Sequence, residues 1–448
     1  MSDKLPLHIH NAYWFQACNA ISWQICLGGP LILFARELGA SATAIGLLVG
    51  LAPIMSLAQL PASRYAEEIG YRKLMLTGWA IRVLILGFLA LLPLMALILP
   101  FQAVVSLLIA VMFCFALLRG ISTCAWLPWV SALVPELLRG TYLANDRRYI
   151  NMASVGALLI SGAILYQGHR MGAFALVFLV GFAAGAVSLW FLRRLPDRPS
   201  PLKSGSVMVH MGWREILADI PFRRLLVFSS MVQLALSANG AFTVVFLREQ
   251  MNLGDGPILW LTAGSAFMGI LALSSLAAWT DRVGSKPFLG LVFFWWLGYF
   301  FLWFLISIHG VKNAHMVSQA LVVVSGFFGS LYELAVTRLL MNMVGNKPAK
   351  TRYFAIYAVV VSMFIGLAPV LWGVLLDGLS TTILSVKGYE LDRYSFFFAA
   401  EWLMLGAVGV MLARLKEAKS ESATFMVYQI FVGMPSRTLS YLIQRIRE

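Results

Sequence analysis

Long apolar segments alternate with short polar loops along the whole chain, and this pattern predicts the fold. A helix needs roughly 20 predominantly apolar residues to cross a bilayer, and twelve such segments follow one another in the sequence. The segments of about 10 residues with alternating polarity that are typical of a membrane β-barrel do not occur. We therefore expect an all-α polytopic membrane protein with twelve transmembrane helices. The expected spans are Asn11–Ala35, Ala44–Tyr65, Leu74–Leu97, Ala103–Leu133, Ile150–Gln167, Gly172–Leu192, Leu225–Leu247, Ile258–Thr280, Phe288–Ile308, His315–Val344, Phe354–Asp377 and Phe396–Leu415.

The composition agrees with this pattern and excludes most water-soluble classes of protein. Of the 448 residues, 60% are hydrophobic and 12% are charged, whereas a soluble domain is about 45–50% apolar and about 25% charged. The sequence has no glycine-rich phosphate loop ending in Lys-Ser or Lys-Thr, and its six histidines are scattered. We therefore expect no enzyme activity, no cofactor and no metal site. The four cysteines lie in apolar segments, which indicates small buried side chains and not a disulfide framework.

The formal net charge of +14 lies mostly in the short loops, and this placement favours membrane orientation over nucleic-acid binding as its explanation. Cytoplasmic loops carry an excess of Lys and Arg. With both termini inside, 26 of the 34 Lys and Arg residues are on the inner side, six are on the outer side, and Arg82 and Arg119 lie within spans. We expect a multi-pass protein of the inner or plasma membrane, surrounded by lipid, with both termini cytoplasmic and no nucleic-acid partner.

The two halves of the chain resemble each other, which indicates a duplication. Phe34–Glu37 matches Phe246–Glu249 at an offset of 212 residues, and two further loop segments match at offsets of 214 and 211. Transporters are often built from such duplicated halves. We expect a six-helix bundle at 1–192, a cytoplasmic linker with a short amphipathic helix at 193–224, a second, pseudo-symmetric six-helix bundle at 225–415 and a cytoplasmic tail at 416–448. For the tail, an interfacial helix and a disordered segment stay open as alternatives.

One loop motif resembles a known family. Ala277–Lys286 is similar to the G-x-L-a-D-r-x-G-r-k signature of the major facilitator superfamily, and Ser63–Arg72 is a weaker copy with Glu67 in place of Asp. The resemblance implies a transporter of two six-helix bundles in which these loops hold a cytoplasmic gate shut. Glycine permits the tight turn that each loop needs. The gate residues that the resemblance implies are Glu67, Gly70, Arg72, Asp281, Arg282, Gly284 and Lys286; solvated loop charges are the alternative.

Charged groups inside spans are costly and are functional hypotheses by default. Arg119 and Glu333 occupy equivalent positions of the two repeats, and the family resemblance implies that their helices line the central cavity. We expect them to bind a charged substrate or to exchange a proton, with a structural ion pair as the alternative. Arg82 and Glu401 also lie within spans, and we expect Arg82 to snorkel towards the inner surface. Amides and an indole of the first and seventh spans complete the expected substrate or proton-coupling set, namely Gln16, Asn19, Trp23, Gln233 and Asn239.

These features favour a secondary active transporter of a small organic solute that works by alternating access and is coupled to protons. One acid and one base in the expected cavity favour a polar or zwitterionic solute over a hydrophobic drug. A drug or metabolite exporter driven by proton antiport is the first alternative, and a membrane sensor or scaffold without transport activity is the second. We expect the partners to be a small-molecule substrate and protons, and we expect a monomer.

Overall fold

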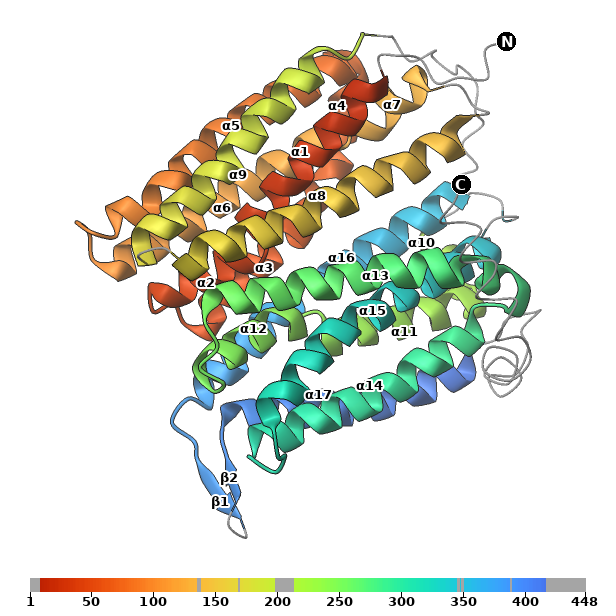
Figure 1. Ribbon diagram of the computed structural model, residues 1–448. Coiled ribbons are helices and arrows are strands. Elements are labelled where there is room, and N and C mark those ends of the chain that lie inside the picture. Colours follow the sequence, from red (N-terminus) through yellow and green to blue (C-terminus); the bar gives the residue numbers. More distant parts are fainter. Residues whose placement is uncertain are drawn as a thin grey trace. The chain divides into compact units, whose positions relative to one another are not determined.

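The computed structural model describes residues 9–134, 138–167, 170–197, 213–344, 347, 350–386 and 389–415 (Figure 1). Within these residues, twelve helical segments are long and apolar enough to cross a membrane. The prediction of an all-α chain with twelve spans is therefore confirmed. The expected tail at 416–448 and residues 198–212 of the expected linker lie outside the described residues.

The first six spans contain ten helical elements. They are α1 (Ile9–Leu27), α2 (Gly29–Glu37), α3 (Ala42–Met55), the 3-10 turn η1 (Ser56–Ala58), α4 (Gln59–Ile69), α5 (Tyr71–Met95), α6 (Phe101–Thr123), α7 (Trp126–Leu133), α8 (Arg139–Gln167) and α9 (Arg170–Arg193).

The rest of the described chain adds eight helices and one hairpin. The helices are α10 (Trp213–Ala218), α11 (Ile220–Leu236), α12 (Asn239–Glu249), α13 (Asp255–Val283), α14 (Lys286–Ser307), α15 (Ala314–Val344), α16 (Lys350–Gly378) and α17 (Arg393–Arg414). Between α16 and α17, β1 (Leu384–Val386) pairs antiparallel with β2 (Tyr389–Leu391). The amphipathic linker helix was predicted, whereas the hairpin was not.

The first and seventh spans are each broken at a similar position along their length. The first breaks at Gly28, between α1 and α2, where Pro30 occupies the first turn of α2 and supplies no backbone N–H donor. The seventh breaks between Leu236 and Asn239. The two halves therefore share a helix interruption as well as sequence.

Contacts divide the chain into two compact units. Unit 1 comprises 1–207, 236–264 and 362–382, and unit 2 comprises 208–235, 265–361 and 383–448. Unit 1 thus holds the first six spans together with α12, the first part of α13 and the last part of α16. The division of the chain into bundles at 1–192 and 225–415 stays a prediction.

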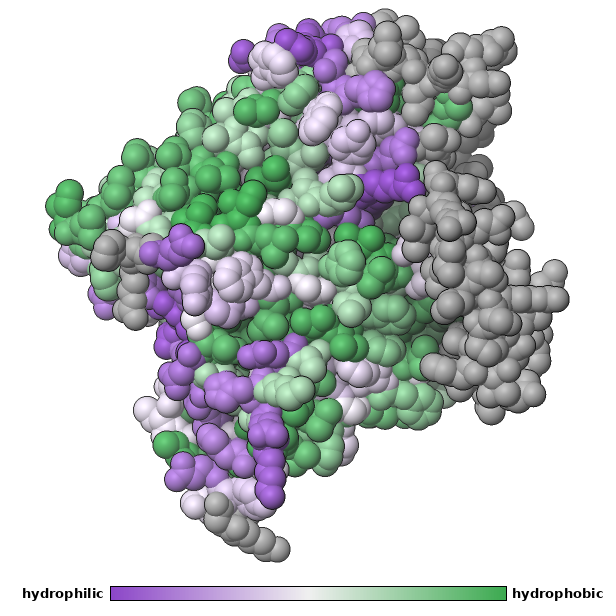
Figure 2. All heavy atoms as spheres, viewed as in Figure 1, coloured by the Kyte–Doolittle hydropathy of each residue, from purple (hydrophilic) through white to green (hydrophobic). Residues whose placement is uncertain are grey.

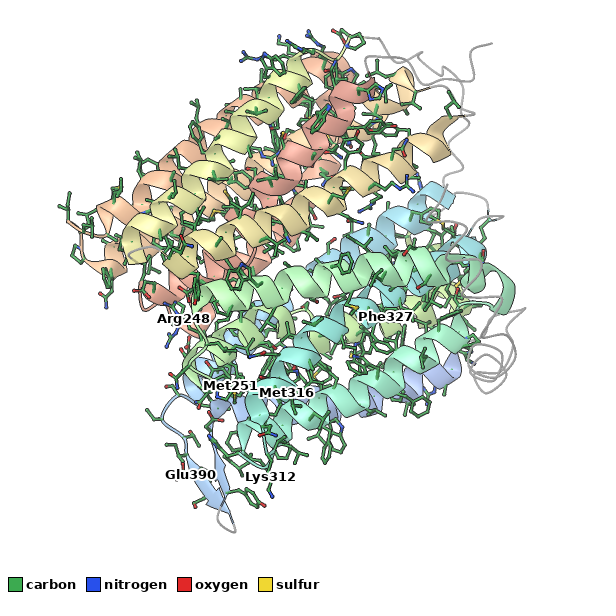
Figure 3. The ribbon with its side chains drawn as sticks, viewed as in Figure 1. Arg248, Met251, Lys312, Met316, Phe327 and Glu390 are labelled. Carbon is green, nitrogen blue, oxygen red and sulfur yellow. The ribbon has the colours of Figure 1, made fainter. Side chains whose placement is uncertain are left out.

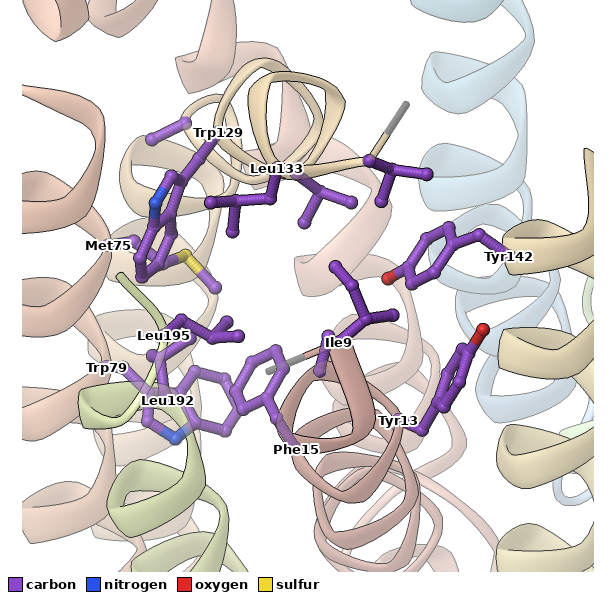
Figure 4. Close-up of a cluster of buried hydrophobic side chains, with 14 of the residues drawn as sticks. Ile9, Tyr13, Phe15, Met75, Trp79, Trp129, Leu133, Tyr142, Leu192 and Leu195 are labelled. Carbon is purple, nitrogen blue, oxygen red and sulfur yellow. The ribbon is translucent and has the colours of Figure 1, made fainter. Parts of the chain in front are cut away.

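A cluster of aromatic side chains forms the core of unit 1 (Figure 4). Trp79 of α5 and Trp129 of α7 are fully buried there, and Phe15 of α1 packs edge-on against Trp79. The polar atoms of the indoles are satisfied, because Trp79 Nε1 donates to Ser188 Oγ at 2.7 Å and Trp129 Nε1 donates to the Pro196 carbonyl oxygen at 3.1 Å. The cluster therefore fixes α1, α5, α7 and α9 against one another.

Unit 2 has its own aromatic packing. Trp303 of α14 is fully buried and stacks on Phe398 of α17, while Trp295 stacks on Phe328 of α15. At another place in this unit, Asp219 precedes α11 and accepts hydrogen bonds from Lys347 Nζ and from Tyr353 Oη. These contacts join the linker end of α11 to the connection between α15 and α16, through Lys347, and to the first turn of α16, through Tyr353.

Hydrophobic side chains cover much of the face that Figure 2 shows, as contact with lipid requires. On α5, Ile81, Leu84, Phe88 and Leu91 are exposed and lie on one side of the helix, and Leu84 is 72% exposed. The opposite side of α5 carries the buried residues Trp79 and Arg82. This stripe assigns one face of α5 to lipid and the other to the interior of unit 1.

Candidate functional site

A chain of polar side chains runs along the first span into unit 1. Asn19 Nδ2 donates to Gln16 Oε1 at 3.4 Å, and Gln16 Nε2 lies 3.5 Å from Asp146 Oδ2 of α8, at the limit of a hydrogen bond. Two of the residues that the sequence predicted, Gln16 and Asn19, are therefore brought together. They meet an acidic residue that the sequence analysis did not select.

Asp146 is a buried carboxyl group in the fifth span. Its side chain is 7% exposed, and its Oδ1 atom has no hydrogen-bond partner among the described residues. We expected this span to begin at Ile150, but α8 already begins at Arg139. The polar segment Asn145-Asp146-Arg147-Arg148 reads as a loop by hydropathy, although it contains no residue that breaks a helix. The sequence signal for a helix here was the spacing of Asp146 four residues after Tyr142, which places the two side chains on the same helix face.

Two arginines lie further along the interior of unit 1. The guanidinium carbon of Arg119 lies 4.0 Å from the ring centroid of Trp23, which is one helical turn beyond Asn19 on α1. Arg82 is 1% exposed and lies between aromatic rings of α5 and α6, so it does not snorkel to the surface as predicted. The predicted residues Arg119, Trp23, Asn19 and Gln16 thus line one interior path.

Two of the predicted residues, Glu333 and Gln233, belong to unit 2. Glu333 of α15 is exposed, and Gln233 of α11 is half-buried. One turn before Gln233, Ser229 accepts a hydrogen bond from Tyr357 Oη of α16 at 2.8 Å. Tyr357 is the repeat equivalent of Asp146, at an offset of 211 residues. Each half therefore joins its first span to its fifth through a hydrogen bond at corresponding positions.

Asn239 and Glu401 complete the set of polar residues that the sequence singled out. Asn239 begins α12 and belongs to unit 1, whereas Glu401 of α17 is fully buried in unit 2. Since Arg119 and Glu333 belong to different units, their pairing stays a prediction.

The residues of the expected cytoplasmic gate are described in part. Gly70 and Gly284 have φ angles of +88° and +95°, in the region that favours glycine, as expected for tight turns. Arg72 donates from Nε to the Leu195 carbonyl oxygen at 3.2 Å and from Nη2 to the Arg193 carbonyl oxygen at 3.0 Å. Arg72 thus binds carbonyl groups at the end of α9 and just beyond it, within unit 1.

The structure shows less about the other four residues of the expected gate. Lys286 is half-buried at the start of α14. The side chains of Glu67, Asp281 and Arg282 lie outside the described part of the structure.

A cluster of ion pairs joins the C-terminal ends of α2 and α12 at one end of unit 1, and we call it the crossed ion pairs. Arg36 of α2 pairs with Glu249 of α12, and Arg248 of α12 pairs with Glu37 of α2. Arg248 also pairs with Asp255 at 3.1 Å, between Nε and Oδ1, and donates from Nη1 to the Leu33 carbonyl oxygen at 2.7 Å (Figure 3). The matched segments of the two repeats therefore contact each other reciprocally.

Close backbone packing continues this end of unit 1. A Cβ atom on Gly46 of α3 would lie 2.1 Å from the Pro369 carbonyl oxygen of α16, and one on Gly50 would lie 2.1 Å from the Gly366 carbonyl oxygen. Small residues allow membrane helices to approach this closely. Asp377 accepts hydrogen bonds from the backbone N–H groups of Ala42 and Thr43 at 2.9 and 2.8 Å, so α16 also caps the start of α3.

Comparison with solved structures shows what fold this is. A D-xylose–proton symporter matches with a TM-score of 0.68 at 15% identity, covering 92% of this chain and 98% of the other. A variant of the nucleoside transporter NupG matches with a TM-score of 0.66 at 12% identity, covering 92% and 99%. The inward-open xylose transporter XylE from E. coli matches with a TM-score of 0.65 at 12% identity, covering 93% and 97%. At these identities the likeness shows the fold alone, which is that of these membrane transporters.

The sequence itself settles the family. It matches none of the curated proteins with which it was compared. The model of the Major Facilitator Superfamily matches residues 13–278, which is more than half of the chain. This range includes the first-half loop motif and the residues that line the interior path of unit 1. The chain is therefore a member of the major facilitator superfamily, a family of membrane-embedded secondary transporters of small molecules and not of enzymes.

Proposed function

We propose that this transporter moves a small organic solute across the inner or plasma membrane by alternating access and couples that movement to protons. The observation that carries the proposal is Asp146, a buried carboxyl group that contacts the amide of Gln16 inside a membrane span. An ionisable group at membrane depth is expensive to retain and marks a substrate or proton pathway. Asp146 has the chemistry to bind and release a proton.

The groups around Asp146 support this role. Gln16 and Asn19 supply amide donors and acceptors, and Trp23 and Arg119 continue the path along α1 and α6. A few convergent polar groups among apolar and aromatic side chains are typical of small-molecule sites. Tyr13 and Tyr142 stack on each other next to Asp146, and Arg147 is its neighbour in sequence. We therefore assign proton coupling to Asp146 in addition to Glu333, and solute orientation to the amides and the indole.

The test follows proton movement in proteoliposomes that contain a pH-sensitive dye. Succinate, alanine, xylose, uridine and tetraphenylphosphonium are added separately to the wild type, to Asp146→Asn and to Asp197→Asn. Asp197 is an exposed aspartate beyond the end of α9, so Asp197→Asn is the matched control.

We expect at least one polar solute to change the internal pH with the wild type and with Asp197→Asn, and not with Asp146→Asn. Exchange of radiolabelled solute without a gradient should persist in Asp146→Asn, because binding and reorientation do not need the proton. Proton movement in Asp146→Asn equal to that of the wild type would contradict the assignment. A response to tetraphenylphosphonium alone would favour the drug exporter.

The orientation and the cytoplasmic gate are part of the proposal. They rest on the distribution of Lys and Arg and on the loop motif with Glu67 and Asp281. A cysteine at Ser204 should react with an impermeant maleimide only from the cytoplasmic side, and a cysteine at Lys312 only from outside. Lys312 is preferable to its neighbour Asn313, whose φ of +58° would strain a cysteine. Reaction of both from the same side would refute the orientation.

A further inference from the structure

Arg82 is a buried cation whose hydrogen-bond donors are not used. Its side chain is 1% exposed, and its Nε and Nη1 atoms have no acceptor among the described residues. It lies on the inward face of α5, opposite the exposed stripe that includes Leu84. A guanidinium carries five N–H donors and stays protonated in proteins, so lipid-facing snorkelling does not account for its position.

Aromatic rings contact Arg82 from two helices. Its guanidinium carbon lies 3.9 Å from the ring centroid of Trp79 and 4.7 Å from that of Phe115. Aromatic rings stabilise a cation that lies over their faces. They accept no in-plane hydrogen bonds, however, so the N–H edge of the guanidinium still needs an acceptor.

Arg119 brings a second positive charge into the same interior. It lies over the ring of Trp23 and one helical turn beyond Phe115 on α6, the ring that Arg82 contacts, so the two positive charges share this part of unit 1. In the described part of the chain, neither arginine forms an ion pair or a side-chain hydrogen bond. Asp146 contacts Gln16, which lies about 10 Å along α1 from Trp23 at the usual helical rise.

Two cations for which the described residues of unit 1 supply no ion-pair partner are unfavourable in a membrane-embedded bundle. What they lack is an acceptor with negative charge and at least two oxygen atoms. Guanidinium groups recognise carboxylate and phosphate groups through paired N–H···O hydrogen bonds. The indole of Trp23 adds an apolar surface beside this position for the remainder of an organic molecule.

We propose that Arg82 and Arg119 form an oxyanion subsite, and that the transported solute carries a carboxylate or phosphate group that binds there. The proposal builds on the proposed function, since it names the chemical class of the solute. It narrows the polar or zwitterionic solute expected from the sequence to one with an anionic group.

The test measures binding in detergent solution, without a membrane or a proton gradient. The melting temperature of the purified protein is followed while acetate, inorganic phosphate, succinate or glucose 6-phosphate replaces chloride at constant ionic strength. Succinamide and glucose are the uncharged counterparts. The variants are Arg82→Met, Arg82→Lys and Arg119→Gln, with Arg194→Gln as the matched control. Arg194 also lies over a ring, that of Trp190 at 3.4 Å, but it is exposed beyond the end of α9.

We expect at least one oxyanion to raise the melting temperature of the wild type and of Arg194→Gln saturably, by about 2 °C or more, because a ligand stabilises the state that it binds. The uncharged counterparts should have no effect. Arg82→Met should lose the response although it folds, since it removes an uncompensated buried charge. Arg82→Lys and Arg119→Gln should weaken the apparent affinity at least about tenfold.

Two results of the melting experiment would overturn the proposal. One is the absence of a saturable response to every oxyanion in the wild type. The other is an unchanged response in Arg82→Met and in Arg119→Gln; if Arg82→Met does not fold, Arg82→Lys and Arg119→Gln decide. Asp146→Asn separates this proposal from the proposed function, because it should keep oxyanion binding while it loses proton movement. Proton-coupled uptake of an uncharged solute that is unaffected by Arg82→Lys would leave transport standing and refute the oxyanion subsite.

Discussion

The crossed ion pairs give a prediction whose size can be worked out from the structure. Under the proposed alternating access, the ends of α2 and α12 that these pairs hold together must separate during the cycle. Removing the pairs should therefore favour the open state. The perturbations are Glu37→Gln and Glu249→Gln, singly and together, which remove the negative charges but keep the shape of the side chains.

The expected magnitude follows from the burial of the pairs. The side chains of Arg36 and Glu249 are 30% and 17% exposed, and those of Arg248 and Glu37 are 17% and 10% exposed. At about 4 Å and an effective dielectric constant of about 20, one pair gains about 4 kcal/mol before desolvation. Partial exposure and the cost of ordering long side chains reduce this to about 1 kcal/mol. Each single variant should thus shift the equilibrium about fivefold, and the double variant about 30-fold.

The assay is the reaction of a cysteine placed at Ala35, which is fully buried next to Arg36. In a background without the four native cysteines, its reaction with an impermeant maleimide from outside reports the open state. The charge exchange Arg36→Glu with Glu249→Arg should restore the slow wild-type rate, and Arg36→Glu alone should accelerate it. Glu390→Gln, on the exposed strand β2 (Figure 3), is the control and should change nothing. An unchanged rate in the double variant would refute the role of the pairs in closure.

Three further results are expected. Gly46→Ala should open the same end, because its Cβ atom would lie 2.1 Å from a backbone carbonyl oxygen of α16 and such overpacking costs about 1–3 kcal/mol. The control is Gly240→Ala, whose Cβ atom would have no neighbour within 4 Å. It should match the wild type in the cysteine assay. Arg119→Met combined with Glu333→Leu should regain the thermal stability that either single change loses, while uptake or its pH dependence stays lost. Full uptake by this double variant with a wild-type pH profile would show that the pair is only structural. Asp281→Asn should leave the protein folded in the membrane, slow uptake and favour inward-open states, and unchanged uptake with unchanged accessibility of the inner cavity would reduce Asp281 to a solvated loop charge.

The spans were predictable because the bilayer imposes a length and an apolar composition on each of them, and both can be read locally. The helix breaks were not all readable in the same way. Gly28-Gly29-Pro30 contains residues that interrupt helices, but the break before Asn239 follows an ordinary Leu-Ser-Ala sequence. The strands β1 and β2 have three residues each, which is too short for an alternating pattern to be recognised.

The candidate site was predictable where a residue type was unusual for its surroundings, as for Gln16, Asn19 and Arg119. Asp146 was missed because its three polar or charged neighbours in sequence lower the local hydropathy. Its burial depends on tyrosines elsewhere in the fold, which the local sequence does not reveal. The sequence also placed Arg82 within a span but could not tell which face of α5 meets lipid. That face is determined by the packing of Trp79 against α1 and α9, which involves residues far apart in the chain.

The crossed ion pairs have the contact rule of an isologous dimer interface, in which residue i of one subunit meets residue j of the other and j meets i. Here both copies of the Arg-Glu segment belong to one chain. In a true homodimer, every substitution would change both pairs at once. Within one chain, each copy can vary separately. The two copies already differ, since Arg248 has the additional partner Asp255 while Arg36 donates to the Ala40 carbonyl oxygen. The two pairs can therefore be tuned to different strengths without loss of the shared geometry.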